Sequence, residues 1–241
     1  MEIEYFLFVL LGFGASIVSA VFGFGTALIV LAVGSHILPV KEAIVLGTVL
    51  FTTSTVLKTV LFTAHINWKL AGLMSVASMP FAFAGASLLS EVPVDVLSRL
   101  LGAMILSYIA LTVFKLTPGF NMGTVGLIGG SAAYGFVSGL LGSGNLIKVI
   151  IFREMHITKH AFVGTMAATS LLSNTAKLGA YGASDLLSID LITPIIGLVL
   201  GSITAVFIGR RILHDVSAAH FEKGIQVLLA VSAFALLIQA V

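Results

Sequence analysis

The stretch from residue 5 to residue 40 reads YFLFVLLGFGASIVSAVFGFGTALIVLAVGSHILPV and carries no Asp, Glu, Lys or Arg. A continuous helix of these 36 residues would be about 54 Å long, whereas the apolar core of a bilayer is about 30 Å thick. Gly23-Phe24-Gly25 stands near the middle of the stretch. We therefore expect a helix that is interrupted at these glycines, either as a kinked span or as a re-entrant hairpin.

The composition of the whole chain agrees with a membrane protein. Of its 241 residues, 59% are apolar and 9% are charged, and the mean hydropathy is +1.16. Soluble domains carry roughly 25% charged residues, so this chain has too few polar side chains to cover a water-exposed surface. Soluble enzymes, nucleic-acid-binding proteins and disordered proteins are thereby excluded. The chain has no cysteine, which removes disulfides, thiolate metal sites and cysteine nucleophiles.

Eight apolar blocks follow one another along the chain, and most of them have the length of one membrane span. They cover residues 5–40, 43–57 (continuing past Lys58), 70–90, 100–114, 116–147, 161–176, 191–209 and 224–241. Like the first block, the fifth is longer than one span, and it contains a similar break, Gly142-Ser143-Gly144. We predict an all-α polytopic membrane protein with about eight transmembrane helices.

The second half of the chain repeats the first. A shift of 119 positions superimposes Ser19 on Ser138, Gly23 on Gly142, Gly25 on Gly144 and Lys58 on Lys177. The pattern predicts two repeats, residues 1–117 and 118–241, each beginning with a glycine-broken helix. If each block crosses the membrane once, the two repeats are parallel. If the broken helices fold back, the number of crossings per repeat becomes odd and the repeats are inverted.

The basic residues near the ends of the blocks suggest an orientation, because cytoplasmic loops are enriched in Lys and Arg. With one crossing per block, two residues lie on one side, Lys69 and Lys115. The opposite side holds seven, namely Lys41, Arg99, Arg153, Lys159, Arg210, Arg211 and Lys223. This count places the first loop in the cytoplasm and predicts that both termini lie outside.

Two lysines in apolar helices are the main candidates for function. Lys58 shares one helix face with Phe51, Ser54 and Thr55, through the spacing i, i+3, i+4 and i+7. The matching face of the second repeat carries Ser170, Ser173, Asn174 and Lys177. A lysine in the membrane is costly unless it is paired or hydrated, and neither helix offers a carboxylate. An anion would supply the missing partner. The alternative is that both lysines snorkel toward the headgroups.

The glycine breaks provide a second part of the candidate site. A helix that restarts after Gly25 or Gly144 presents free N–H groups and the positive end of its dipole, which favour an anion. Thr26 and Asn145 stand where a capping or ligand-binding side chain would be. The alternative is a plain packing kink. Lys148, one turn further on, either joins the site or snorkels. The predicted substrate-binding residues are Lys58, Lys177, Ser54, Thr55, Ser173, Asn174, Gly25, Thr26, Gly144 and Asn145.

These motifs resemble those of the sulfite exporter TauE/SafE family, also described as four-TMS sulfite/organosulfonate permease-like transporters. The resemblance rests on Ser19-Ala-Val-Phe-Gly23-Phe-Gly25 with Gly47-Thr48, and on Ser138-Gly-Leu-Leu-Gly142-Ser-Gly144 with Gly164-Thr165. It covers essentially the whole chain, although Phe22 and Phe24 make the first break bulkier than the family's run of glycines. The resemblance implies export or uptake of sulfite, sulfoacetate or a related organosulfonate.

We therefore predict a secondary transporter in the cytoplasmic (inner) membrane of a prokaryote, working by alternating access at a cationic site between the repeats. The main alternative is an anion channel that uses the same lysines for selectivity. An enzyme is not expected, since acid–base residues at depth are missing, and a non-transporting partner subunit would leave the lysines unexplained. We expect no cofactor, no metal and no nucleic acid. The expected partners are a small anion and the lipid bilayer, with a homodimer as a possible assembly.

Overall fold

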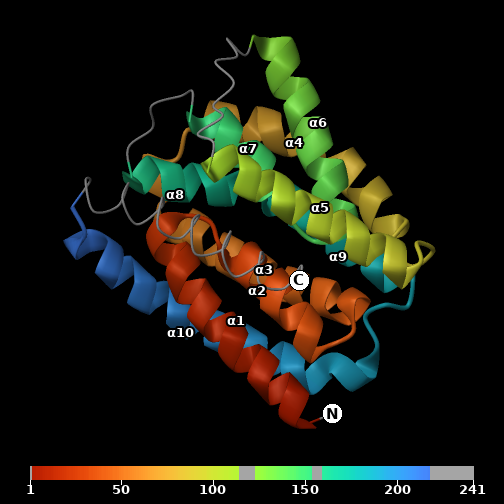
Figure 1. Ribbon diagram of the computed structural model, residues 1–241. Helices are drawn as coiled ribbons and strands as arrows, with labels where there is room; N and C mark the ends of the chain where they lie inside the picture. The colour runs from red at the N-terminus through yellow and green to blue at the C-terminus, as the bar shows by residue number, and fades with distance from the viewer. Residues whose placement is uncertain (1, 114–122, 154–158, 218–241) are drawn as a thin grey trace.

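The computed structural model describes residues 2–113, 123–153 and 159–217, and these ranges contain helices and no strand (Figure 1). The α-helices are α1 (Glu2–Phe22), α2 (Thr26–Ile37), α3 (Val40–Leu61), α4 (Trp68–Ser87), α5 (Val94–Val113), α6 (Thr124–Leu141), α7 (Asn145–Arg153), α8 (Lys159–Ala168), α9 (Leu171–Ala183) and α10 (Ile192–Asp215). Two short 3₁₀ turns, Thr63–His65 and Ile189–Leu191, precede α4 and α10. The prediction of an all-helical protein is confirmed.

Five helices in the described part of the chain are long and apolar enough to cross a membrane. They are Ile3–Phe22, Val40–Leu61, Trp68–Ser87, Thr124–Leu141 and Ile189–Asp215. The predicted total of eight spans therefore stays a prediction, and the last apolar block, 224–241, lies outside the described residues. The sixth block is divided into α8 and α9 at Thr169 and Ser170, so neither piece reaches the length of a span.

The first glycine break is the tip of a hairpin. Gly23 and Gly25 have φ angles of 84° and 107°, a left-handed conformation that side chains rarely adopt. After this turn α2 runs back along α1. The close approach of Gly34 to Phe8 shows this, since a Cβ on Gly34 would lie 2.5 Å from Cε2 of Phe8. A hydrogen bond from the Tyr5 hydroxyl to Glu42 also joins the beginning of α1 to the beginning of α3. Of the two geometries that the sequence left open, the structure has the hairpin.

The second break has the same form. α6 ends at Leu141, Gly142 follows with a φ of 79°, and α7 begins at Asn145. α7 then returns along α6. Gly130 of α6 lies close to Ile151 of α7, and a Cβ on Gly130 would be 3.2 Å from Cδ1 of Ile151. The two hairpins place both turns deep in the protein, with Gly23 and Gly142 both buried.

The two halves interlock through close helix pairs. α1 packs along α10, and α6 packs along α4 (Figure 1). A Cβ on Gly135 would collide with the Ser78 carbonyl oxygen, and one on Gly139 would collide with that of Ala82. The contacts advance in the same direction along both helices, so α4 and α6 are parallel. Small residues allow this close approach of the backbones, as is common between membrane helices.

α3 and α9 are antiparallel and meet near their middle. Near one end of the contact a Cβ on Gly164 of α8 would lie 2.9 Å from Cβ of Phe62, just past α3. Further along, the Asn174 amide of α9 donates to the Thr55 hydroxyl of α3 at 3.3 Å. Thr55 and Asn174 stand 119 positions apart, the shift that superimposes the two halves. Because α3 has the length of a span, this antiparallel contact is the geometry expected of inverted halves.

The hairpins change which loops share an end of the molecule. Lys41 lies in the first turn of α3, whereas Leu213, near Arg211 of α10, packs against Phe62 just past the last turn of α3. α3 has 22 residues and is about 33 Å long. Lys41 and Arg211 therefore lie at opposite ends of the molecule, and the prediction that they share one side is wrong. The cause is α2, which returns the chain to the end where α1 begins.

Candidate functional site

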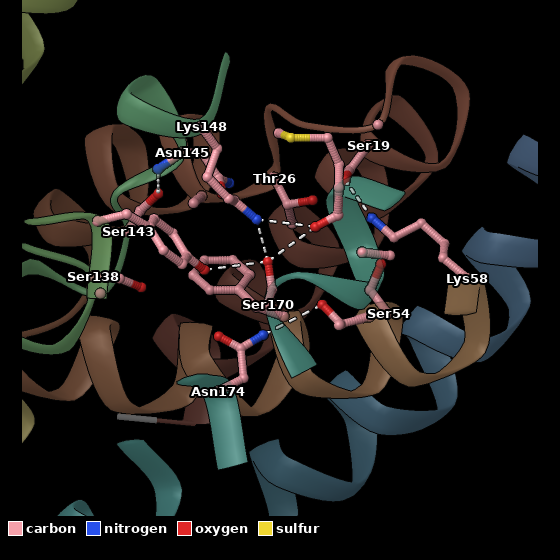
Figure 2. A pocket seen from close by; sticks show the side chains of 18 of the residues that line it. Ser19, Thr26, Ser54, Lys58, Ser138, Ser143, Asn145, Lys148, Ser170 and Asn174 are labelled. Carbon is pink, nitrogen blue, oxygen red and sulfur yellow. Dashed lines mark hydrogen bonds between the residues drawn. The ribbon is translucent and has the colours of Figure 1, made fainter. Parts of the chain in front are cut away.

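A cavity of about 40 Å³ lies where the two hairpin tips meet α3 and the α8–α9 junction (Figure 2). Its lining combines lysines, hydroxyl groups and amides with a few apolar side chains. The lining residues are Ser19, Gly23, Thr26, Ala27, Phe51, Ser54, Thr55, Lys58, Tyr134, Ser138, Gly142, Ser143, Asn145, Lys148, Met166, Ala167, Ser170, Asn174 and Lys177. Both halves of the chain contribute to it.

Lys58 reaches the cavity from the face of α3 that the sequence indicated. Its side chain is 5% exposed, and its ammonium group donates to the Ser19 hydroxyl of α1 at 2.8 Å (Figure 2). A lysine ammonium has three N–H donors, so two of those of Lys58 have no acceptor within residues 2–113, 123–153 and 159–217. The side chain is turned inward, which does not fit the snorkelling alternative.

Lys177 occupies the matching position on α9. It is 1% exposed and donates to the Ser138 hydroxyl of α6 at 3.2 Å and to the Gly142 carbonyl at 3.0 Å. One of its three donors is left without an acceptor in the described part of the chain. Each lysine thus binds a serine that precedes it by 39 positions, one on α1 and one on α6.

Lys148 is the third lysine of the cavity. It extends from α7 and is 1% exposed. Its ammonium group donates to the Met166 carbonyl at 2.9 Å, to the Thr169 hydroxyl at 3.3 Å and to the Ser170 hydroxyl. The group also lies 4.6 Å from the centre of the Tyr134 ring, a cation–π contact. All three donors of Lys148 have protein acceptors.

Five of the six predicted residues with a hydroxyl or amide side chain line the cavity, and Ser173 is the exception. Ser54, Thr55 and Asn174 line the cavity as predicted, together with Thr26 and Asn145 at the starts of α2 and α7. The Ser54 hydroxyl is buried and has no hydrogen-bond partner among the residues that the structure describes.

Three predicted residues do not line the cavity. The Ser173 hydroxyl lies 2.6 Å from the Ser78 hydroxyl of α4. Gly25 and Gly144 are buried in the hairpin turns behind the cavity wall. The turns place Thr26 and Asn145, rather than the glycines themselves, against the cavity.

Sequence reasoning missed Tyr134, Ser143 and Ser138 as lining residues, and left Lys148 undecided. Tyr134 donates from its hydroxyl to the Ser170 hydroxyl at 3.2 Å. Nothing in an apolar helix pattern marks Tyr134 as different from a core aromatic residue. The shift of 119 positions does mark Ser138, because it falls on Ser19.

The charge of the site is one-sided. Three ammonium groups lie around one small cavity, and none of the lining residues that the structure describes is Asp or Glu. The unused hydrogen-bonding capacity of Lys58 and Lys177 consists of donors only, since an ammonium group cannot accept. Chemically, the arrangement can hold a small anion with several acceptor oxygens, bound by charge-assisted hydrogen bonds.

Comparison with known proteins gives one match. The family model described as Sulfite exporter TauE/SafE matches residues 8–236, nearly the whole chain. The matched region includes both glycine hairpins and every residue that lines the cavity. No curated protein and no solved structure matches the chain.

Proposed function

The chain belongs to the sulfite exporter TauE/SafE family, and on that premise we propose that it is a secondary transporter of a small sulfur-containing anion. Membership in this family implies membrane transport of sulfite or a similar anion. The finer statements are our proposal, namely that the substrate is sulfite, sulfoacetate or a related organosulfonate, and that it binds in the cavity between the two halves.

The observation that carries the proposal is the unpaired donor capacity of the two matched lysines. Lys58 has two N–H donors and Lys177 has one for which the described residues offer no acceptor. Buried charges in proteins are normally paired, because an unpaired one loses its hydration without compensation. An oxyanion between the two ammonium groups would provide both the acceptors and the opposite charge.

Ser54 supports the same position for the anion. Its hydroxyl is buried, lines the cavity and lacks a partner, which is uncommon for buried polar atoms. It lies one helical turn before Lys58 on the same face of α3. A substrate oxygen bound by Lys58 would therefore also lie close to the Ser54 hydroxyl.

The size of the cavity favours a small ion. A buried water needs roughly 10–15 Å³ of space, so the 40 Å³ cavity has room for about three waters or for one compact oxyanion. A larger organosulfonate would require the cavity to widen, which alternating access would allow.

We further propose that two inverted repeats, 1–117 and 118–241, expose the cavity alternately to the two sides. The antiparallel contact of α3 with α9, and the pairing of α1 with α10 and of α6 with α4, support this arrangement. Rocking of the α1–α10 pair against the α4–α6 pair would move the cavity wall without unfolding either hairpin.

Thermal unfolding of the detergent-purified protein tests the proposed site. A ligand that binds only the folded state raises the melting temperature. Sulfite, sulfoacetate, sulfate, acetate and chloride would be compared on the wild type, Lys58→Met and Lys177→Met, with Lys69→Met as a control at an exposed lysine. We expect stabilisation by a sulfur oxyanion in the wild type and Lys69→Met only. Stabilisation that both cavity variants retain would contradict the proposal.

A further inference from the structure

The third lysine of the cavity differs from the other two in its hydrogen bonding. Lys58 and Lys177 keep free donors, whereas Lys148 gives all three of its donors to neutral groups of the protein. Those groups belong to Met166, Thr169 and Ser170, which surround the junction between α8 and α9. Lys148 has no donor left for a transported anion.

The junction needs an outside donor because the helix is broken there. In a continuous helix the amide of Ser170 would donate to the carbonyl of Met166, four residues earlier. Instead it donates to Ala167 at 2.9 Å, and Thr169 donates from its amide to Thr165. The Met166 carbonyl is freed, and it accepts from Lys148 at 2.9 Å and from the hydroxyls of Thr169 and Ser170.

The matching helix of the first half has neither this lysine nor a break. A shift of 119 positions places Lys148 on Ile29, Thr169 on Leu50 and Ser170 on Phe51. Here α3 is unbroken from Val40 to Leu61. The lysine and the helix break therefore occur together in one half and are absent together from the other.

The break has a consequence for the cavity. Ser170 lines it where α3 presents Phe51, and α9 starts at Leu171, one turn before Asn174 and two turns before Lys177. Figure 2 shows the Lys148 ammonium group directed at Ser170 beside the cavity. The position of α9, and with it of Lys177, depends on how the junction is held.

We propose that Lys148 is a positioning residue, which holds the break between α8 and α9 and so places Lys177 and Asn174 for the anion. The inference rests on the proposed function in assigning the anion to Lys58 and Lys177. It assigns no contact with the substrate to Lys148, although this lysine lines the same cavity. The two halves therefore have unequal roles, because the first half has no counterpart of the lysine-held junction.

Hydrogen exchange of the purified full-length protein without substrate tests the positioning role. We expect Lys148→Met to speed amide exchange in residues 165–175 at least tenfold, because the acceptors at the junction lose their charged donor. Lys148→Arg keeps the donors and should stay within threefold of the wild type. Lys58→Met is the matched control and should leave this segment unchanged. Unchanged exchange in Lys148→Met would overturn the proposal.

Sulfite binding by the purified protein separates positioning from ligation. Lys148→Gln removes the charge but keeps N–H donors. Lys58→Gln makes the same change at a lysine that is proposed to bind the anion. We expect the dissociation constant for sulfite to rise less than fivefold in Lys148→Gln and more than tenfold in Lys58→Gln. Equal losses in the two variants would overturn the positioning role.

The two measurements also distinguish the inference from the proposed function. If the wild type binds no sulfur oxyanion, the proposed function fails, while the exchange experiment still decides whether Lys148 holds the junction. If Lys148→Met does not fold, the comparison of Lys148→Arg and Lys148→Gln with the wild type gives the same answer. In that case Lys148→Gln, which keeps two neutral donors on a shorter side chain, should exchange faster than Lys148→Arg but less than tenfold faster than the wild type, and equal exchange in the two variants would count against the proposal.

Discussion

The Asn174 amide donates a hydrogen bond to the Thr55 hydroxyl at 3.3 Å, so two residues that stand 119 positions apart meet where α3 and α9 pack together. Each lies one helical turn before a cavity lysine, Thr55 before Lys58 and Asn174 before Lys177. The contact therefore joins the two helices that carry the cavity lysines. The same contact relates the two halves of the chain, because each half supplies one partner from equivalent positions.

Removing both partners of this central hydrogen bond tests its contribution. Thr55→Val and Asn174→Leu should each destabilise the protein, and the double-mutant cycle should give a coupling free energy of about 1 kcal/mol, typical of a net hydrogen bond. The measurement is reversible unfolding in mixed detergent micelles. Strict additivity of the two substitutions would show that the contact contributes nothing to stability.

The α4–α6 contact should be intolerant of any side chain at Gly139. A Cβ there would collide with the Ala82 carbonyl oxygen, which belongs to the backbone and cannot move without shifting a helix. We expect Gly139→Ala to cost about 1–3 kcal/mol, as overpacking typically does. Gly129→Ala on the same helix is the control, since a Cβ at that position meets nothing within 4 Å. Equal melting temperatures for the two variants would contradict the close packing.

The unpaired hydroxyl of Ser54 should matter for the ligand and not for the fold. We expect Ser54→Ala to weaken sulfite binding about tenfold, the loss of roughly one hydrogen bond to a charged group, without lowering the melting temperature of the free protein. Ser16→Ala is the matched control, because the Ser16 hydroxyl is also buried and unpaired but does not line the cavity. Isothermal titration with sulfite separates the two variants, and equal affinities would exclude Ser54 from the site.

The hairpin of α1 and α2 predicts which residues face the same side of the membrane. The chain has no cysteine, so single cysteines can be labelled from either side of sealed vesicles. Cysteines at Glu4 and Lys41 should react from one side, and a cysteine at His65 should react from the other. A kinked single span would instead put Glu4 and Lys41 on opposite sides, and that labelling pattern would rule the hairpin out.

The parts of the site that sequence could predict are those that violate the chemistry of the membrane. Lys58 and Lys177 stood out because a charge in an apolar helix is costly, and because the two lysines match each other after the 119-residue shift. Thr26 and Asn145 followed from the glycine breaks. Ser173 does not line the cavity although it shares the predicted helix face, because a helix face covers a wide arc and the Ser173 hydroxyl is occupied by its contact with Ser78.

Tertiary contacts explain the rest. A glycine pair permits both a kink and a hairpin, and the packing of Phe8 on Gly34 selects the hairpin. The prediction that Lys41 and Arg211 lie on one side was wrong for this reason. A helix that turns back moves the loops after it to the other end of the molecule. The break at Ser170 has no glycine or proline to announce it, since its stability comes from Lys148 on another helix.

Counterflow in proteoliposomes tests most directly whether the protein transports a sulfur oxyanion that binds between Lys58 and Lys177. Vesicles loaded with unlabelled sulfite should take up external radiolabelled sulfite in a saturable manner. We expect Lys58→Met and Lys177→Met to abolish this exchange, and Lys69→Met to exchange like the wild type. Flux that does not saturate and shows no exchange would indicate a channel, and exchange that survives in both cavity variants would contradict the account.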